Sequence, residues 1–108
     1  MTDPHGPALR LTIFVGEYDQ SNHAAVCELI VRHAHDHGLA VVSVLHGIEG
    51  YGVHSRIHTQ RILSLAEDLP MVVVIVDVEQ RIREFLPSLD DIVAEGLAVI
   101  DHVQLSHA

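Results

Sequence analysis

The apolar positions along the chain follow two periods, one typical of strands and one typical of helices. In residues 9–15, every second side chain is apolar, so one face of this segment can lie against a core. This alternation predicts a half-buried β-strand. Residues 40–45 and 71–78 are rich in β-branched side chains, and 97–105 is a fourth apolar run. The pattern therefore predicts four strands.

The helical period appears between the first and second of these strands. Val26, Leu29, Ile30 and His33 fall on one helical face, and Ser21 or Asn22 precedes them as a candidate N-cap. Gly38 follows the last periodic residue, where a helix commonly ends on a left-handed glycine. We expect a first helix that ends at Gly38.

A second helical stripe begins at Glu79 and ends before Gly96. Pro87 lies inside it, where proline removes one backbone hydrogen bond and clashes with the carbonyl of Arg83. A kink, or a new helical start with Ser88 near the cap, is therefore expected. The apolar members of the stripe are Ile82, Phe85, Leu86, Leu89, Ile92 and Val93.

The predicted order of elements is β-α-β-loop-β-α-β. This order predicts an α+β fold, a ferredoxin-like βαββαβ sandwich with two helices on one face of a four-stranded antiparallel sheet. The long loop joins strands two and three. Residues 1–8 are expected to be a flexible N-terminal segment, and residues 9–108 a single domain. Because several strands are apolar on both sides, a second copy of the chain is expected to cover the open sheet face.

The charge balance restricts the class of partner. The chain has 108 residues, with 6 basic and 15 acidic side chains and a formal charge of −9, and none of the basic residues is lysine. Nucleic-acid binding needs clustered basic residues, so it is excluded as the expected function. One cysteine permits no intrachain disulfide, and without a signal-peptide pattern we expect a cytoplasmic protein.

The segment 45–70 is too long for a hairpin connection and is expected to be functional. Gly47, Gly50 and Gly52 lie near its start, where glycine permits backbone N–H groups to approach an anion. A plain flexible turn is the alternative. Arg56 is a guanidinium able to pair with a phosphate or carboxylate, and an exposed solubilising role is its alternative.

Several short motifs together resemble one known family. They are LTIFVGE, GLAVVSVLHGIEGYG, SRIHT, SLAEDLPMVVVIVD and RIREFLPSLDDIV, and they extend over residues 9–105. This combination is similar to the PII-like proteins of the domain of unknown function 190, which resemble the PII nitrogen-regulatory proteins in fold. The resemblance implies a homotrimer.

The PII resemblance implies a signalling protein that binds an adenine nucleotide in clefts between subunits. The long loop would then control a partner such as a membrane transporter. The match to the PII loop start is Gly50-Tyr51-Gly52. A departure is that AEGLAVIDHVQLSHA lacks the Gly-x-Gly-Lys turn and basic residues with which PII proteins hold phosphates. AMP or ADP is therefore the expected ligand. The predicted binding residues are Gly47, Gly50, Gly52, Ser55, Arg56 and His58.

Histidine spacing suggests a second function class. His54 and His58 are four residues apart, a spacing that places two imidazoles on one helical face for a metal ion. The alternative function is thus a divalent-metal-binding trimer, in the manner of the similarly folded CutA proteins. His33 and His37 share this spacing at the end of the first predicted helix. No enzymatic activity is expected, because no nucleophile with an ordered base is evident.

Overall fold

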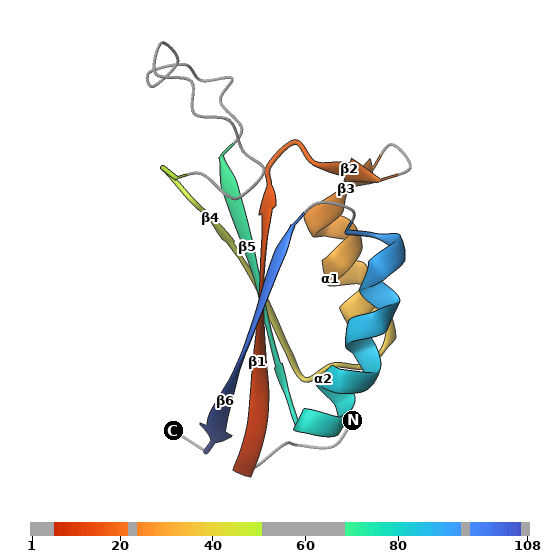
Figure 1. The fold of residues 1–108 in the computed structure, drawn as a ribbon, viewed down its shortest axis with the longest axis vertical. Coiled ribbons are helices and arrows are strands. Elements are labelled where there is room, and N and C mark those ends of the chain that lie inside the picture. The colour runs from red at the N-terminus through yellow and green to blue at the C-terminus, as the bar shows by residue number, and fades with distance from the viewer. Residues whose placement is uncertain (1–5, 22–23, 51–68, 94–95, 107–108) are drawn as a thin grey trace.

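The computed structural model of the chain describes residues 6–21, 24–50, 69–93 and 96–106. Its strands and helices follow one another in the predicted order, with one additional short hairpin (Figure 1). No helix in these ranges is long and apolar enough to cross a membrane. The elements are β1 (Gly6–Gly16), β2 (Gln20–Ser21), β3 (Ala24–Ala25), α1 (Val26–Asp36), β4 (Val41–His46), β5 (Pro70–Asp77), α2 (Glu79–Phe85), the 3-10 helix η2 (Leu86–Asp91) and β6 (Leu97–Leu105).

The main sheet has four strands in the order β4-β5-β1-β6, and every neighbouring pair is antiparallel. Leu11 in the central strand β1 lies opposite Ile75 of β5 and Ile100 of β6. Both helices cover one side of the sheet, as Figure 1 shows. The ferredoxin-like sandwich expected from the order of elements is confirmed.

Strand β1 begins at Gly6, three residues before the expected start at Leu9. Gly6 pairs with Leu105 at the far end of β6. Because β6 is long, it provides pairing partners for residues 6–8 as well. Ala8 is only 2% exposed. Residues 6–8, expected in a flexible segment, therefore belong to the sheet.

The start of helix α1 also differs from the expectation. The helix begins at Val26, and Ala25 precedes it without a side-chain capping bond, so capping by Ser21 or Asn22 is wrong. Residues 20–25 instead contain the short β2–β3 hairpin, in which Ser21 pairs with Ala24. The Val26 N–H donates to the Asp19 carbonyl at 2.9 Å, so the backbone supplies the acceptor that a capping side chain would provide.

The predicted end of α1 is confirmed. Gly38 has a φ of +69°, the left-handed conformation that glycine adopts without a steric penalty. Its N–H donates to the His35 carbonyl at 2.9 Å, and the Leu39 N–H donates to the Ala34 carbonyl at 3.1 Å. This pair of bonds is the Schellman motif, which satisfies carbonyls that the helix leaves free.

Pro87 interrupts the second helix as expected, but Ser88 is not the cap of a new helix, because η2 begins at Leu86 with Phe85 before it. Helix α2 ends at Phe85, and the chain continues through Pro87 as the 3-10 helix η2. The Ser88 hydroxyl donates to the Phe85 carbonyl at 2.5 Å. Because proline has no N–H, the tighter 3-10 turn and this side-chain bond replace a continued α-helical ladder.

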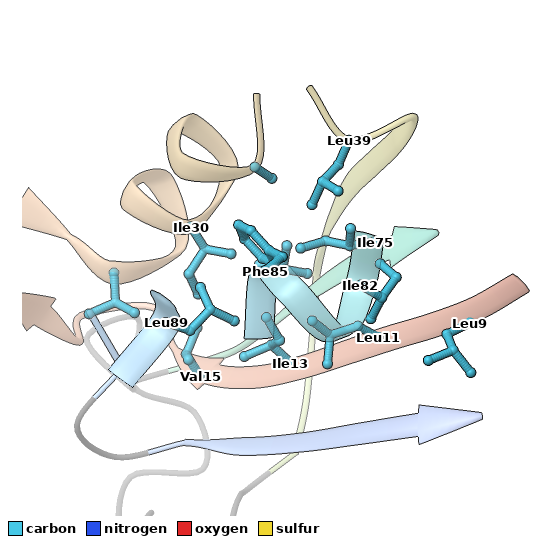
Figure 2. Packing of buried hydrophobic residues seen from close by; sticks show 13 residues of the cluster. Leu9, Leu11, Ile13, Val15, Ile30, Leu39, Ile75, Ile82, Phe85 and Leu89 are labelled. Carbon is cyan, nitrogen blue, oxygen red and sulfur yellow. The ribbon is translucent and has the colours of Figure 1, made fainter. Parts of the chain in front are cut away.

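The hydrophobic core lies between the sheet and the helix layer. Phe85 of α2 occupies its middle, with Ile30 of α1 and Ile75 of β5 nearby (Figure 2). Complete burial of such side chains contributes about 1.5–3 kcal/mol each. The buried apolar residues that form this cluster are Leu9, Leu11, Ile13, Val15, Val26, Ile30, Ala34, Leu39, Val73, Ile75, Ile82, Phe85 and Leu89.

One charged side chain, Asp77, is buried with this core at 2% exposure. Its two carboxylate oxygens accept the N–H of Ala40 at 3.0 Å and the N–H of Val78 at 2.7 Å. Arg81 Nε lies 3.5 Å from Asp77 Oδ2, and Arg81 Nη2 donates to the Gly38 carbonyl at 2.7 Å. These contacts join the end of α1 to the end of β5 and the start of α2, so they orient the two helices on the sheet.

Candidate functional site

The ends of β4 and β5 form the base of the long connection between them. The Gly47 N–H donates to the Pro70 carbonyl at 2.7 Å, which closes this base. A Cβ atom at Gly47 would lie 2.5 Å from Pro70 Cγ, a separation too short for any side chain. Gly50 has a φ of +145° and also approaches Pro70. Glycine is therefore required here by close packing as well as by backbone conformation.

A polar pair lies beside these glycines. His46 Nε2 is 2.8 Å from Glu17 Oε2, and their side chains are 49% and 26% exposed. The Glu17 N–H donates to the Leu69 carbonyl at 2.8 Å. Glu17 follows β1 and His46 ends β4, so the pair spans the start of β5, which lies between those strands. Three strand ends are joined at this position.

The turn after β1 is held by its own side chain. The Gly16 N–H donates to Asp19 Oδ2 at 2.8 Å, and the Asp19 N–H donates to the Gly16 carbonyl at 3.2 Å. Because the turn is closed in this way, Glu17 projects from an ordered backbone. A titratable imidazole and a carboxylate therefore lie at a defined place beside Gly47.

Only part of the predicted ligand site can be placed. Gly47 and Gly50 lie together against Pro70, as described above. Gly52, Ser55, Arg56 and His58 lie outside the described residues, and so does the predicted metal ligand His54. Their convergence stays a prediction. Within the described ranges, no group of three or more His, Cys, Asp or Glu side chains could hold a metal ion.

Sequence reasoning missed Glu17 and His46 as members of this site. Both residues occur in the sequence motifs quoted above, LTIFVGE and GLAVVSVLHGIEGYG, but neither is recognisable there as a site residue. The signal that could have found them is topological, because each lies at the boundary of a predicted strand. In a sheet of order β4-β5-β1, β1 and β4 are both antiparallel to β5, so their C-terminal ends lie at the same end of the sheet.

The sheet face that carries no helix is strongly apolar, and we call it the open face. Phe14 of β1 lies opposite Val72 of β5 and Leu97 of β6, and directly opposite residues share a face. Phe14 is 38% exposed and Leu97 is 47% exposed. Leu45 of β4, also opposite Val72, is 57% exposed. The open face reaches the loop base, since Leu45 immediately precedes His46.

An ion pair lies further along the open face. Arg10 Nη2 is 2.6 Å from Asp101 Oδ2, and Arg10 Nε donates to Asp101 Oδ1 at 3.1 Å. The carboxylate stabilises the charged guanidinium through these hydrogen bonds and raises the pKa of Arg10. The pair occupies opposed positions on β1 and β6, so an apolar area is followed by a bidentate ion pair on the same face.

A family profile and a relative each match most of the chain. The profile of DUF190, described as an uncharacterized ACR, matches residues 8–105. A protein of Aquifex aeolicus named UPF0166 is 28% identical over 95 residues, which cover 88% of this chain and 90% of the relative.

Solved structures of PII-like proteins share the fold. CPII from Thiomonas intermedia, a nitrogen regulatory PII-like protein solved with ADP, AMP and bicarbonate, is similar with a TM-score of 0.66 and 13% identity. The similarity covers 93% of this chain and 96% of that one. A Thermus thermophilus protein described as PII-like is similar with a TM-score of 0.66 and 14% identity, over 95% of this chain and 93% of that protein.

Proposed function

The chain belongs to the DUF190 family, and we propose that it is a PII-like regulatory protein that senses a small anionic ligand. The observation that carries the proposal is the long connection 47–69, which leaves the sheet at an ordered base in a chain with a PII-like fold. In this proposal the ligand changes the state of that connection, and the connection contacts a partner. The protein itself catalyses no reaction.

An adenine nucleotide, AMP or ADP, is the proposed ligand. Its support is that the similar CPII structures contain ADP with AMP or bicarbonate. Backbone N–H groups near Gly50 and the Arg56 guanidinium would hold the phosphate, because both donate to anionic oxygens. The remaining proposed binding residues are Gly47, Gly52, Ser55 and His58.

We further propose a homotrimer in which open faces pack around a common axis. The support is the row of exposed apolar side chains on Phe14, Leu45 and Leu97, since contiguous exposed apolar surface marks an interaction site. Because Leu45 adjoins the loop base, such packing would bring a neighbouring subunit next to the proposed ligand site. The ligand would then bind between subunits.

The regulated partner is proposed from the resemblance to PII proteins alone. A membrane transporter is the partner class that this resemblance implies, with this protein acting on it from the cytoplasm. The acidic balance of the chain, with a formal charge of −9, disfavours direct binding to anionic lipid or nucleic acid. A protein surface on the transporter is therefore the proposed contact.

Calorimetry with AMP, ADP, ATP and bicarbonate tests the ligand proposal. Charge-assisted hydrogen bonds contribute about 1.5–3 kcal/mol, so Arg56→Ala should weaken AMP binding by roughly ten- to a hundredfold. Arg32→Ala is the matched control, because Arg32 is an exposed guanidinium on α1 that pairs only loosely with Glu28, at 3.5 Å.

Two outcomes would overturn the assignment. Unchanged affinity in the Arg56 variant would remove Arg56 from the site, and no binding of any of the four ligands would remove the sensing function as proposed. Binding of Zn²⁺ that depends on His54 and His58, without nucleotide binding, would favour the metal-binding trimer instead.

A further inference from the structure

Two histidines at the C-terminal end of α1, one in its last turn and one at its C-cap, form a preorganised pair. The ring centroids of His33 and His37 are 4.3 Å apart, with the ring planes inclined at 63°. Both rings also contact the buried ring of Phe85, at centroid distances of 5.3 and 5.4 Å. Phe85 thus supports both imidazoles from the core side, and His37 remains exposed to solvent.

Hydrogen bonding determines which nitrogen of His33 carries its proton. The Ser88 hydroxyl has one hydrogen, which it donates to the Phe85 carbonyl. Ser88 Oγ is therefore the acceptor in its 2.8 Å bond with His33 Nε2, and His33 is the donor. In a serine nucleophile with a histidine base, the serine hydroxyl donates to the imidazole, so the direction of the hydrogen bond here is the opposite one. His33 Nδ1 is left with a free lone pair in the neutral ring.

His37 is oriented in a similar way by the backbone. Its Nδ1 lies 2.9 Å from the His33 carbonyl oxygen, which can only accept a hydrogen bond. Nδ1 therefore carries the proton, and His37 Nε2 has the lone pair. Metal-ligating histidines almost always donate their other ring N–H to a carbonyl, carboxylate or similar oxygen. Both members of this pair already make such a bond.

We propose that His33 and His37 bind one divalent transition-metal ion, through Nδ1 of His33 and Nε2 of His37. Two imidazoles on one ion, with metal–nitrogen bonds of about 2.0–2.1 Å, place their ring centroids roughly 4.5–5 Å apart. The observed separation of 4.3 Å is close to this value. Imidazole nitrogens are good ligands for zinc, copper and nickel ions, and water completes the coordination.

The electrostatic surroundings suit a cation in this position. The pair lies at the C-terminal end of a helix, where the macrodipole favours positive charge, and Asp36 is on the same turn. Burial, with a contribution from His37, lowers the pKa of His33. The Arg81 guanidinium, which donates to the His37 and Gly38 carbonyls, also lies near the Asp77 carboxylate.

Titration with Zn²⁺ tests the site on the full chain, in the double variant His54→Gln/His58→Gln so that the other predicted pair cannot contribute. Long-range ¹H–¹⁵N spectra distinguish the two nitrogens of each imidazole. We expect saturable shifts of His33 Nδ1 and His37 Nε2 at one Zn²⁺ per chain. If other imidazoles shift first, or if Zn²⁺ moves Nε2 of His33 instead, the proposal is wrong.

Matched variants separate this site from general histidine binding. His37→Gln should abolish the one-equivalent binding seen by calorimetry, whereas His35→Gln should retain it, because the His35 side chain is 89% exposed, with its Nδ1 3.7 Å from Asp36 Oδ1. Ser88→Ala removes the acceptor that orients His33 and should weaken Zn²⁺ binding by roughly 10–100-fold. Thermal unfolding without metal verifies that each variant folds. A folded His37→Gln variant with unchanged stoichiometry would overturn the assignment.

Discussion

The imidazole of His46 and the carboxylate of Glu17, 2.8 Å apart, join the ends of two strands that are not neighbours in the sheet. Strand β5 begins between them, and its first carbonyl accepts the Gly47 N–H. The base of the long connection is therefore held by contacts among three strand ends. Any ligand-dependent change in the connection would begin from this ordered base.

We expect His46→Ala to loosen this base without unfolding the domain. A partly exposed ion pair contributes about 0–1 kcal/mol, so global stability should change by less than about 1 kcal/mol. Amide hydrogen exchange at Gly47 and Glu17 should become faster. In the wild type, local opening must break the side-chain pair, and without that pair the free energy of opening is lower. His35→Ala, at an exposed histidine on α1, is the control. Unchanged exchange at both amides would show that the pair does not hold the base.

Asp77→Ala should destabilise the domain strongly. The substitution leaves the partly buried N–H groups of Ala40 and Val78 without their acceptor, and an unsatisfied donor shielded from water costs about 1–3 kcal/mol. We therefore expect a loss of roughly 2–6 kcal/mol in urea unfolding. Asp90→Ala, at an exposed carboxylate of η2, should change stability little. A loss below 1 kcal/mol for Asp77→Ala would contradict this role.

The start of α2 should contribute a pH-dependent stability. The hydrogen bond from Arg83 Nε, at 2.7 Å, lowers the pKa of the Glu79 carboxyl below its usual value of 4.5. Because the folded state holds the proton less tightly than the unfolded state, this contribution is fully present above pH 4.5 and is lost as pH falls through the lowered pKa. The difference in unfolding midpoint between wild type and Glu79→Gln should therefore shrink in acid.

Glu84→Gln is the control for this pH dependence, because the Glu84 carboxylate accepts a hydrogen bond from the neutral amide of Gln80. Its difference from wild type should vary less with pH than that of the Glu79 variant. Equal pH profiles for the two variants would refute the assigned role of Arg83.

The open face should mediate self-association. Light scattering of the wild type at micromolar concentration should give a trimer mass, and Phe14→Asp should give a monomer, because a charge would be buried at the subunit contact. Gln80→Asp adds the same charge on α2, on the other side of the sheet, and should remain trimeric. A monomeric wild type would contradict the trimer, and a trimeric Phe14 variant would place its interface elsewhere.

Much of the architecture was predictable because the relevant signals are local. The alternation in β1, the apolar run of β5 and the exact bounds of β6 follow from the side-chain periodicity along single segments. Gly38 ended α1 as predicted, since a helix end depends on a few consecutive residues. The predicted start of α1 was wrong because the Asp19 carbonyl accepts the Val26 N–H and because Ser21, one of the two expected caps, pairs with Ala24 instead.

The candidate site was less predictable, because contacts between distant segments create it. Gly47 was recognised as a glycine near a loop start, but its need to pack against Pro70, 23 positions later, depends on the strand register. Glu17 and His46 have no local pattern that relates them. The remaining predicted ligand residues lie outside the described ranges, so their arrangement is a prediction for the binding experiments.

By itself, the sequence determined the number and type of the main elements, the two-sided apolar strands and the interruption of the second helix at Pro87. These properties depend on periodicity and on the covalent chemistry of single residues. Only the tertiary structure decided that Asp77 joins the two helices, that His46 pairs with Glu17, and that Ser88 determines the protonated nitrogen of His33. Those contacts join residues 29 to 55 positions apart or orient one proton, and the folded chain alone brings their atoms within hydrogen-bonding distance.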